Sequence, residues 1–182
     1  MPNYSIHTIA SAPENSKPAL AQLQQAFGVI PNIAAAIANS PKLINSLVGV
    51  FQQVHSSSLT EAEIQIVLLT DAVANSSTYA VAFHTALALK QKVSSKEIDA
   101  IRQRRVPSDK RFAALSNLAK TLIDTRGHLS AEELNAFLAA GFTKEQVLEV
   151  IAIVAASTIT NYAGTIANPP LEDPFRQYAW QG

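Results

Sequence analysis

The sequence predicts an all-α protein of about eight or nine helices, built as one domain. Apolar residues recur with a helical period along the chain, and no segment shows the alternation of a strand. A chain of 182 residues with 48% hydrophobic and 15% charged residues is long enough for one buried core and short for two. We expect a single domain over 1–182, with 1–16 as an N-terminal extension and 168–182 as a C-terminal tail packed on the body or on a neighbouring subunit.

Helix starts are marked by residues that cap free backbone amides. Thr60, Ser95, Ser130 and Thr143 each precede acidic residues, and an oxygen cap followed by acids in the first turn suits the helix dipole. The expected helices are Lys17 to Phe27, Pro31 to Ala38, Pro41 to His55, Thr60 to Ala74, Ser77 to Gln91, Ser95 to Arg104, Asp109 to Thr125, Ser130 to Ala140 and Thr143 to Ala167.

Proline and glycine support these bounds. Pro31 and Pro41 fit a first helical turn, and Gly127 and Gly141 can close helices in the left-handed conformation. The apolar stretch from Val147 to Ala167 is as long as a membrane span but contains several polar residues, so we interpret it as a buried core helix.

Charge and cysteine content exclude several classes of function. Lys plus Arg and Asp plus Glu number 14 each, so no overall field attracts nucleic acid or an anionic membrane. With no cysteine the chain has no disulfide, thiolate metal site or cysteine nucleophile. The histidines lack metal-ligand spacing, and we expect neither metal nor cofactor. No basic region followed by an apolar core opens the sequence, so we expect a cytoplasmic protein.

The run from Asn75 to Thr85, Asn-Ser-Ser-Thr-Tyr-Ala-Val-Ala-Phe-His-Thr, carries the most specific signal. It resembles the segment Asn-Gly-Cys-x-x-Cys-x-x-x-His that opens a helix in the carboxymuconolactone decarboxylase and alkylhydroperoxidase D-like (AhpD-like) superfamily. The resemblance extends roughly from Phe27 to Asp173. It includes Val29-Ile30-Pro31-Asn32-Ile33, the helix start from Gly141 to Val150, and Asn161 followed by Pro169-Pro170-Leu171. It implies an AhpD-like helical bundle that assembles into dimers, trimers or hexamers.

The same resemblance assigns the family's catalytic relay to altered residues. The two cysteine positions are Ser77 and Ala80, and the glutamate that accepts a proton twelve residues earlier is Gln65. Only His84 is retained. A serine hydroxyl without a paired base lacks thiolate-like reactivity, Ala80 supplies no resolving thiol, and an amide accepts no proton. Since general-base help alone is worth ~10²–10⁴ in rate, we expect no dithiol peroxidase activity.

Each remaining polar residue has a structural and a functional interpretation. Ser77 is favoured as a helix cap rather than a nucleophile, and His84 is either a hydrogen-bonded, partly buried residue or a functional acid or base. Tyr79 can bind a carbonyl oxygen or lie at the core edge, and Gln65 can be satisfied in the core or position a ligand. Asp71 is favoured as exposed, with a buried acid of raised pKa as the alternative.

Two classes of function follow. We favour a carboxymuconolactone decarboxylase-like or peroxidase-related protein without its thiol centre, which binds a small carboxylated or hydrophobic molecule or serves only as an oligomer. The alternative is a cofactor-free lyase or decarboxylase that acts on a small carboxylated substrate, with His84 as acid or base. The partners we expect are further copies of the chain and this small molecule.

Overall fold

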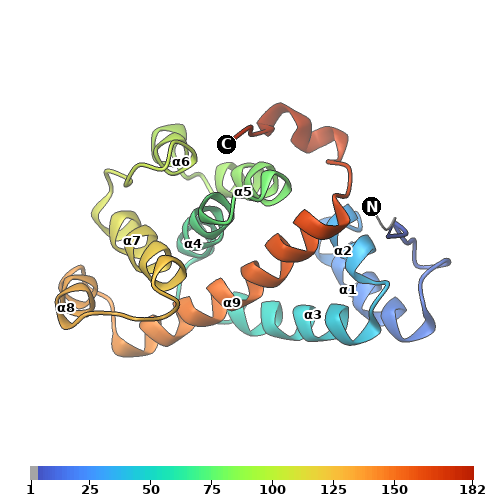
Figure 1. The fold of residues 1–182 in the computed structure, drawn as a ribbon, viewed down its shortest axis with the longest axis horizontal. Coiled ribbons are helices and arrows are strands. Elements are labelled where there is room, and N and C mark those ends of the chain that lie inside the picture. The colour runs from blue at the N-terminus through green and yellow to red at the C-terminus, as the bar shows by residue number, and fades with distance from the viewer. Residues whose placement is uncertain (1–3) are drawn as a thin grey trace.

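In the computed structural model, residues 4–182 fold into nine α-helices and two short 3₁₀ helices, with no strand in that range (Figure 1). The all-α prediction is therefore confirmed. Of the N-terminal extension expected over 1–16, residues 1–3 lie outside the described part. The elements are η1 (Glu14–Ser16), α1 (Lys17–Phe27), α2 (Asn32–Ile37), α3 (Pro41–His55), α4 (Glu61–Ala74), α5 (Thr78–Lys90), α6 (Ser95–Arg102), α7 (Lys110–Asp124), α8 (Ala131–Ala139), α9 (Lys144–Ala167) and η2 (Asp173–Tyr178).

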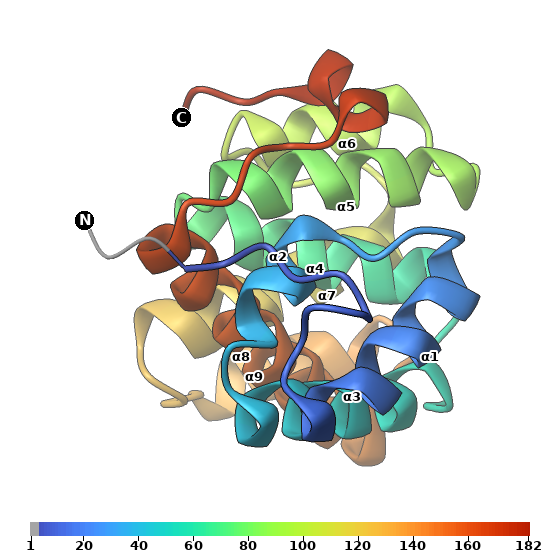
Figure 2. The same cartoon turned by 90° about the vertical axis from the view of Figure 1, so that its right-hand side faces the viewer.

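Helix α4 is the centre of the molecule. Every residue from Glu63 to Val73 is buried, because α4 packs against α5, α7 and α9 (Figure 2). A helix that is apolar on all sides has its place inside a bundle rather than at its surface. Its first turn is held by a capping box in which Thr60 and Glu63 bind each other's backbone amides, an arrangement worth about 1 kcal/mol.

Two hydrophobic clusters divide the interior. The larger one joins α4 to α7 and α9, and the smaller one lies between α1, α2, α3 and the first turns of α5, where Tyr79 and Phe83 project. Full burial of one Leu or Ile is worth about 1.5–3 kcal/mol, so both clusters hold their helices firmly. Most of the apolar residues that line the cavity described below belong to the smaller cluster, while Leu68 and Ala80 belong to the larger one.

The predicted helix bounds agree with the structure to within two residues at each end. Pro41 opens α3 as predicted, and Gly127 and Gly141 adopt φ of 88° and 91°. One cap was assigned wrongly: Ser94, not Ser95, accepts the hydrogen bond from the Glu97 amide. Both serines carry a capping hydroxyl, and the Ser-Ser pair does not reveal which residue leaves the helix first.

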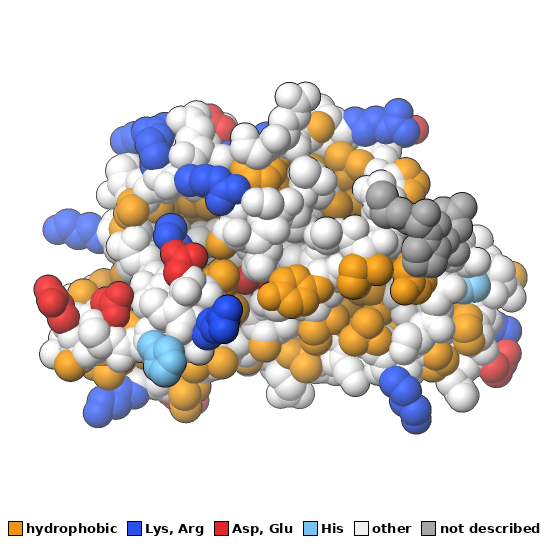
Figure 3. Space-filling view, in the orientation of Figure 1, with side chains coloured by type: hydrophobic (Ala, Val, Ile, Leu, Met, Phe, Trp, Pro, Cys, Tyr) orange, Lys and Arg blue, Asp and Glu red, His pale blue; other side chains and the backbone are white. Residues whose placement is uncertain are grey.

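The interpretation of α9 as a buried core helix is wrong in part. Among the described residues, α9 is the one helix whose length and apolar composition would allow it to cross a membrane. Only 33% of its most apolar 18-residue window is buried. One face contacts α2, α3, α4, α5 and α7, while the other is open. Hydrophobic side chains gather along the face of the molecule that α9 crosses (Figure 3).

The C-terminal tail lies across α5 and α6. The Phe175 ring meets the edge of Phe83 with centroids 5.0 Å apart. The indole N–H of Trp180 donates to the Arg102 carbonyl at 3.0 Å, and the Arg102 guanidinium donates to two tail carbonyls at 3.0 and 3.1 Å. These contacts give η2 a fixed place beside α5, in a segment where the sequence predicts no helix.

Candidate functional site

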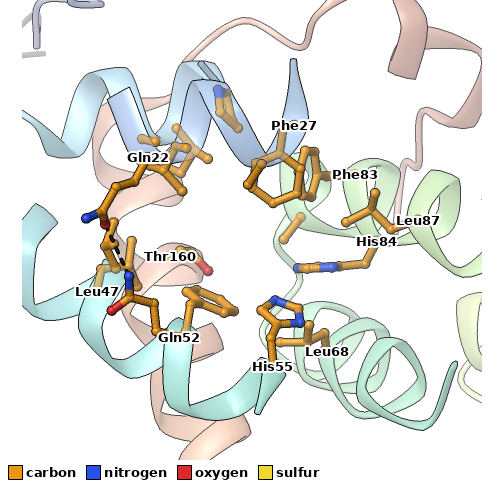
Figure 4. Close-up of a pocket in the computed structure, with 18 of the residues that line it drawn as sticks. Gln22, Phe27, Leu47, Gln52, His55, Leu68, Phe83, His84, Leu87 and Thr160 are labelled. Carbon is orange, nitrogen blue, oxygen red and sulfur yellow. Dashed lines mark hydrogen bonds between the residues drawn. The ribbon is translucent and has the colours of Figure 1, made fainter. Parts of the chain in front are cut away.

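A cavity of about 550 Å³ opens between α1, α3, α4 and α5 (Figure 4). Its wall is formed mostly by aliphatic and aromatic side chains. Three of the site residues predicted from the sequence line it: Gln65 from α4, and Ala80 and His84 from α5. Ala80 and His84 are four residues apart, so they lie on the same face of their helix. The other lining residues are Gln22, Leu23, Ala26, Phe27, Pro31, Ile33, Ala34, Leu47, Val48, Phe51, Gln52, His55, Ser56, Leu68, Tyr79, Phe83, Leu87 and Thr160.

His84 is the buried polar group of this cavity, with 6% of its surface exposed. Its Nδ1 lies 3.0 Å from Gln65 Oε1. Because an amide oxygen only accepts, Nδ1 carries the proton and Nε2 keeps a free lone pair. Figure 4 shows the His84 ring pointing from α5 into the cavity. The site therefore presents an acceptor nitrogen among apolar side chains.

Burial controls the charge of this ring. The loss of hydration lowers the pKa of His84 to about 3, and the nearby positive charge of His55 lowers it further in the same direction. At neutral pH the imidazole is neutral, and it acts as a hydrogen-bond acceptor rather than an acid. The sequence left His84 as either a hydrogen-bonded, partly buried residue or a functional acid or base. In the structure it is buried and hydrogen-bonded, and it also lies on the cavity wall.

His55 lies on the α3 side of the same cavity (Figure 4). Its Nδ1 is 3.0 and 3.1 Å from the two carboxylate oxygens of Glu61, and its ring stacks on Phe51 with centroids 6.0 Å apart. The carboxylate partner fixes the orientation of the ring. Sequence reasoning missed this residue, although the spacing of six between His55 and Glu61 across a short loop was visible.

Tyr79 contributes its ring to the cavity but not a free hydroxyl. The hydroxyl donates to the Glu172 carboxylate, with oxygen distances of 2.8 and 3.0 Å, and accepts from the Ile33 amide at 3.4 Å. Burial raises the pKa of Tyr79, and the negative charge of Glu172 raises it further. The Glu172 carboxylate also accepts from the Asn32 amide at 2.6 Å. The contacts agree with the interpretation of Tyr79 as a core-edge residue with a bonded hydroxyl, and this hydroxyl anchors the tail.

Ser77 lies outside this cavity. It occupies the N-cap position of α5, but its hydroxyl makes no capping hydrogen bond, so the cap predicted there is correct in position only. Its side chain faces a second hollow that it shares with Gly164 and Trp180. The two residues that the resemblance equates with cysteines therefore lie apart, with Ala80 in the cavity and Ser77 beyond its wall.

Asp71 is buried, and the preference for an exposed Asp71 is wrong. It has 0% exposure, accepts from Asn161 Nδ2 at 2.6 Å and from Asn75 Nδ2 at 3.2 Å, and does not line the cavity. Burial raises the pKa of Asp71 to about 7, against the effect of hydrogen bonds from Ser157, Asn75 and Asn161. It joins the end of α4 to α9 and serves packing rather than the cavity.

The fold is that of an AhpD-like helical bundle, and the chain has no thiol. Residues 41–121 match the model of the carboxymuconolactone decarboxylase family, and this match together with the solved structures below confirms the resemblance predicted from the sequence. The chain contains no cysteine. No curated protein gave a match.

Solved structures extend the likeness over nearly the whole chain. An uncharacterized peroxidase-related protein with an alkylhydroperoxidase AhpD core from Ralstonia eutropha JMP134 is 19% identical, with a TM-score of 0.83 and coverage of 95% of this chain and 93% of its own. A cysteine-to-alanine variant of the debrominase Bmp8 in complex with 2,3,4-tribromopyrrole is 16% identical, with a TM-score of 0.80 and coverage of 98% and 96%. A peroxidase-related protein from Silicibacter sp. TM1040 is 14% identical, with a TM-score of 0.79 and coverage of 96% and 94%.

Proposed function

We propose that this protein binds a small, mostly apolar ring molecule without redox chemistry, and that His84 accepts a hydrogen bond from the ligand's single N–H or O–H donor. The observation that carries the proposal is the buried pair of His84 Nδ1 and Gln65 Oε1, 3.0 Å apart on the wall of an apolar cavity. Gln65 fixes the ring so that the Nε2 lone pair is available. A donor on the ligand would complete the hydrogen bonding of the pair.

The cavity supports an apolar ligand over a carboxylated one. A volume of about 550 Å³ is within the usual range for small-molecule sites. No Lys or Arg is among the residues that line it, and the low pKa of His84 leaves that ring uncharged at neutral pH. A carboxylate deep in such a space would lose its hydration beside a neutral His84, and the His55 ring on the same wall already faces the Glu61 carboxylate. Between the two partner chemistries expected from the sequence, we therefore choose the hydrophobic one.

Thiol chemistry is incompatible with the residues present. The chain contains no cysteine, and Gln65 cannot accept a proton where the family relay requires a glutamate. The lyase alternative needs His84 as an acid or base. A ring with a pKa of about 3 holds no transferable proton at neutral pH and is a weak base, which favours binding over turnover.

The ring-shaped ligand has support from a protein of the same fold. The debrominase Bmp8 was solved in complex with 2,3,4-tribromopyrrole, a flat ring with one N–H. Indole and N-methylindole are flat ring probes that differ by one methyl group, which takes the place of the proton on the ring nitrogen. Because the methyl group also adds size, the hydrogen bond that we assign to His84 is read from the change in the preference for indole between the unchanged protein and His84→Phe.

Titration calorimetry at pH 7.5 tests the proposal. We expect indole to bind about 3- to 10-fold more tightly than N-methylindole, because one net hydrogen bond is worth ~0.5–1.5 kcal/mol. The change His84→Phe should remove this preference and keep apolar binding. The matched control His128→Phe changes an exposed loop histidine and should keep it. Equal affinities for the two probes in the unchanged protein would contradict the acceptor role, and no binding of either would contradict the proposed function.

A further inference from the structure

A second hollow lies at the N-terminal end of α5, and Tyr79 borders both it and the main cavity. Its volume is about 890 Å³. The wall is made by the turn that opens α5, the last turn of α9 and both ends of the C-terminal tail, which Figure 2 shows leaving α9 and passing α5. Hydroxyl and amide side chains are common on this wall, and none of the described residues that line it is Asp or Glu. The hollow therefore suits a polar ligand, and no carboxylate of its lining residues repels an anion.

The first backbone amides of α5 are free at the end of the helix that borders this hollow. Val81 makes the first main-chain hydrogen bond of the helix, from its amide to the Ser77 carbonyl at 2.9 Å. The amides of Thr78 and Tyr79 come before it, both residues line the hollow, and neither amide has a partner among the described residues. Free N–H groups and the helix dipole give such an end a positive character, which binds phosphate and other oxyanions.

The Ser77 hydroxyl is an independent sign of a ligand. Ser77 is only 4% exposed, yet its hydroxyl neither caps α5 nor hydrogen-bonds to any other described residue. Its Oγ lies 3.8 Å from the point where a Cβ on Gly164 would stand, so the missing side chain of Gly164 keeps the space beside the hydroxyl open. Buried polar groups nearly always have a partner, because leaving one without a partner is costly. An oxyanion in the hollow would accept this hydrogen bond.

Arg104 brings a positive charge to the edge of the hollow. Its Nη2 donates to Ser76 Oγ at 3.0 Å, and its guanidinium carbon lies 5.4 Å from the centre of the Trp180 ring. Ser76 and Trp180 both belong to the wall, so these two contacts hold the guanidinium beside it. Guanidinium groups bind phosphate through charge-assisted and often paired hydrogen bonds.

The other charged groups near the tail do not cancel this preference. The Glu172 carboxylate does not line the hollow, and it already accepts from the Tyr79 hydroxyl at 2.8 Å and from the Asn32 amide at 2.6 Å. Arg102 adds a second cation behind the tail, where it donates to the carbonyl of the wall residue Ala179 at 3.1 Å. The two arginines therefore outweigh this one engaged carboxylate at the hollow.

We propose that this hollow binds a phosphate group, either as inorganic phosphate or as the phosphoryl group of a small polar molecule. The Thr78 and Tyr79 amides and the Ser77 hydroxyl donate to its oxygens, and Arg104 supplies the opposite charge. A tetrahedral phosphate has enough oxygens for donors that come from a helix end, a side chain and a guanidinium. The volume of about 890 Å³ leaves room for an organic group next to the phosphate. The site does not include His84, so this proposal and the proposed function fail separately.

Titration calorimetry with inorganic phosphate at pH 7.5 and low salt tests the site. We expect millimolar or tighter binding by the unchanged protein and about 10-fold weaker binding by Ser77→Ala, because hydrogen bonds to charged groups are the stronger kind. Arg104→Gln should weaken binding about 3-fold at low salt and less at high salt, since the charge is exposed. The matched control is Arg126→Gln. Both arginines are exposed with left-handed φ of 58° and 56°, and the control should bind phosphate like the unchanged protein, as should His84→Phe.

Thermal unfolding separates a ligand-binding role of Ser77 from a structural one. Because its hydroxyl makes no hydrogen bond to the described residues, Ser77→Ala should unfold in phosphate-free buffer at the same temperature as the unchanged protein or above it. Added phosphate should raise the unfolding temperature of the unchanged protein more than that of Ser77→Ala, since a ligand stabilises the state that binds it.

Glycerol 3-phosphate and acetate identify the anion. Tighter binding of glycerol 3-phosphate than of inorganic phosphate assigns the hollow to the phosphoryl group of an organic molecule, and equal or weaker binding assigns it to the free anion. Three results would overturn the proposal: no phosphate binding at millimolar concentrations, binding of acetate in preference to phosphate, or equal phosphate affinity in the unchanged, Ser77→Ala and Arg104→Gln proteins.

Discussion

Replacement of the buried Asp71 by Asn should change the pH dependence of folding. Burial raises the pKa of this carboxyl from 3.8 to about 7, so the folded state holds the proton more tightly than the unfolded state. The resulting stabilisation is fully present below about pH 3.8 and is lost as the pH rises to about 7. The difference between the two pKa values corresponds to about 4 kcal/mol, an upper figure for this group.

Asparagine keeps the shape of the side chain and stays neutral at every pH. Its amide can also donate to the side-chain oxygen Oδ1 of Asn161, which has no hydrogen-bond partner among the described residues. We expect Asp71→Asn to be nearly neutral at pH 4 and to raise the free energy of unfolding by up to about 4 kcal/mol at pH 7.5. The control is Leu122→Asn at another buried position. It should give no comparable gain in stability, because it buries an amide and removes no ionisable carboxyl.

His84 changes the stability with pH in the opposite direction to Asp71, so its contribution has to be separated from that of Asp71. Its pKa falls from 6.5 to about 3 on folding, so its contribution is present above about pH 6.5 and is lost as the pH falls. The free energy of unfolding in urea is measured from pH 4 to 8 for the unchanged protein and for Asp71→Asn. The contribution of His84 cancels in the difference between the two curves, because both proteins contain this histidine. Two stability curves that stay parallel over this range would show that Asp71 is ionised in the folded protein.

Three further outcomes follow from the site. The purified protein should not reduce organic hydroperoxides with dithiol reductants, and turnover that disappears on replacing His84 would contradict this. The combined change Gln65→Glu, Ser77→Cys and Ala80→Cys should allow a disulfide, because the two cysteines are three residues apart at a helix start. Mass spectrometry of the folded, oxidised protein checks this. If it finds only free thiols, Ser77 and Ala80 do not occupy the two cysteine positions of the family. Tyr79→Phe should cost about 1–3 kcal/mol and speed hydrogen exchange in the tail, because it leaves the Glu172 carboxylate with one partner fewer; unchanged exchange there would show that the aromatic contacts hold the tail alone.

Local sequence signals predicted the helices well. The cap residues Thr60, Ser130 and Thr143 act within three residues of themselves, so the pattern contains all the information that the structure uses. Asp71 shows the limit of this reasoning. An acid inside an apolar run has the same local pattern whether it faces water or a distant asparagine, and Asn161 is 90 positions away in the chain.

The family pattern singled out three residues that line one cavity, Gln65, Ala80 and His84, but it did not reveal that Ser77 faces a different hollow. Glu172 was missed because its role depends on the tail crossing back over α5, a contact between residues 93 positions apart. Contacts of this kind arise from tertiary packing, and no local period signals them.

The boundaries of the matched family segment have a consequence for ligand choice. Residues 41–121 include Gln65 and His84, but α1, α2 and Thr160, which complete the cavity wall, lie outside that segment. Relatives can therefore keep the same polar pair while substitutions at Gln22 or Phe27 reshape the space in front of it. We therefore expect proteins of this fold to group by ligand when they are compared at the lining residues of α1, α2 and α9. A comparison over the matched segment 41–121 alone should group them less well.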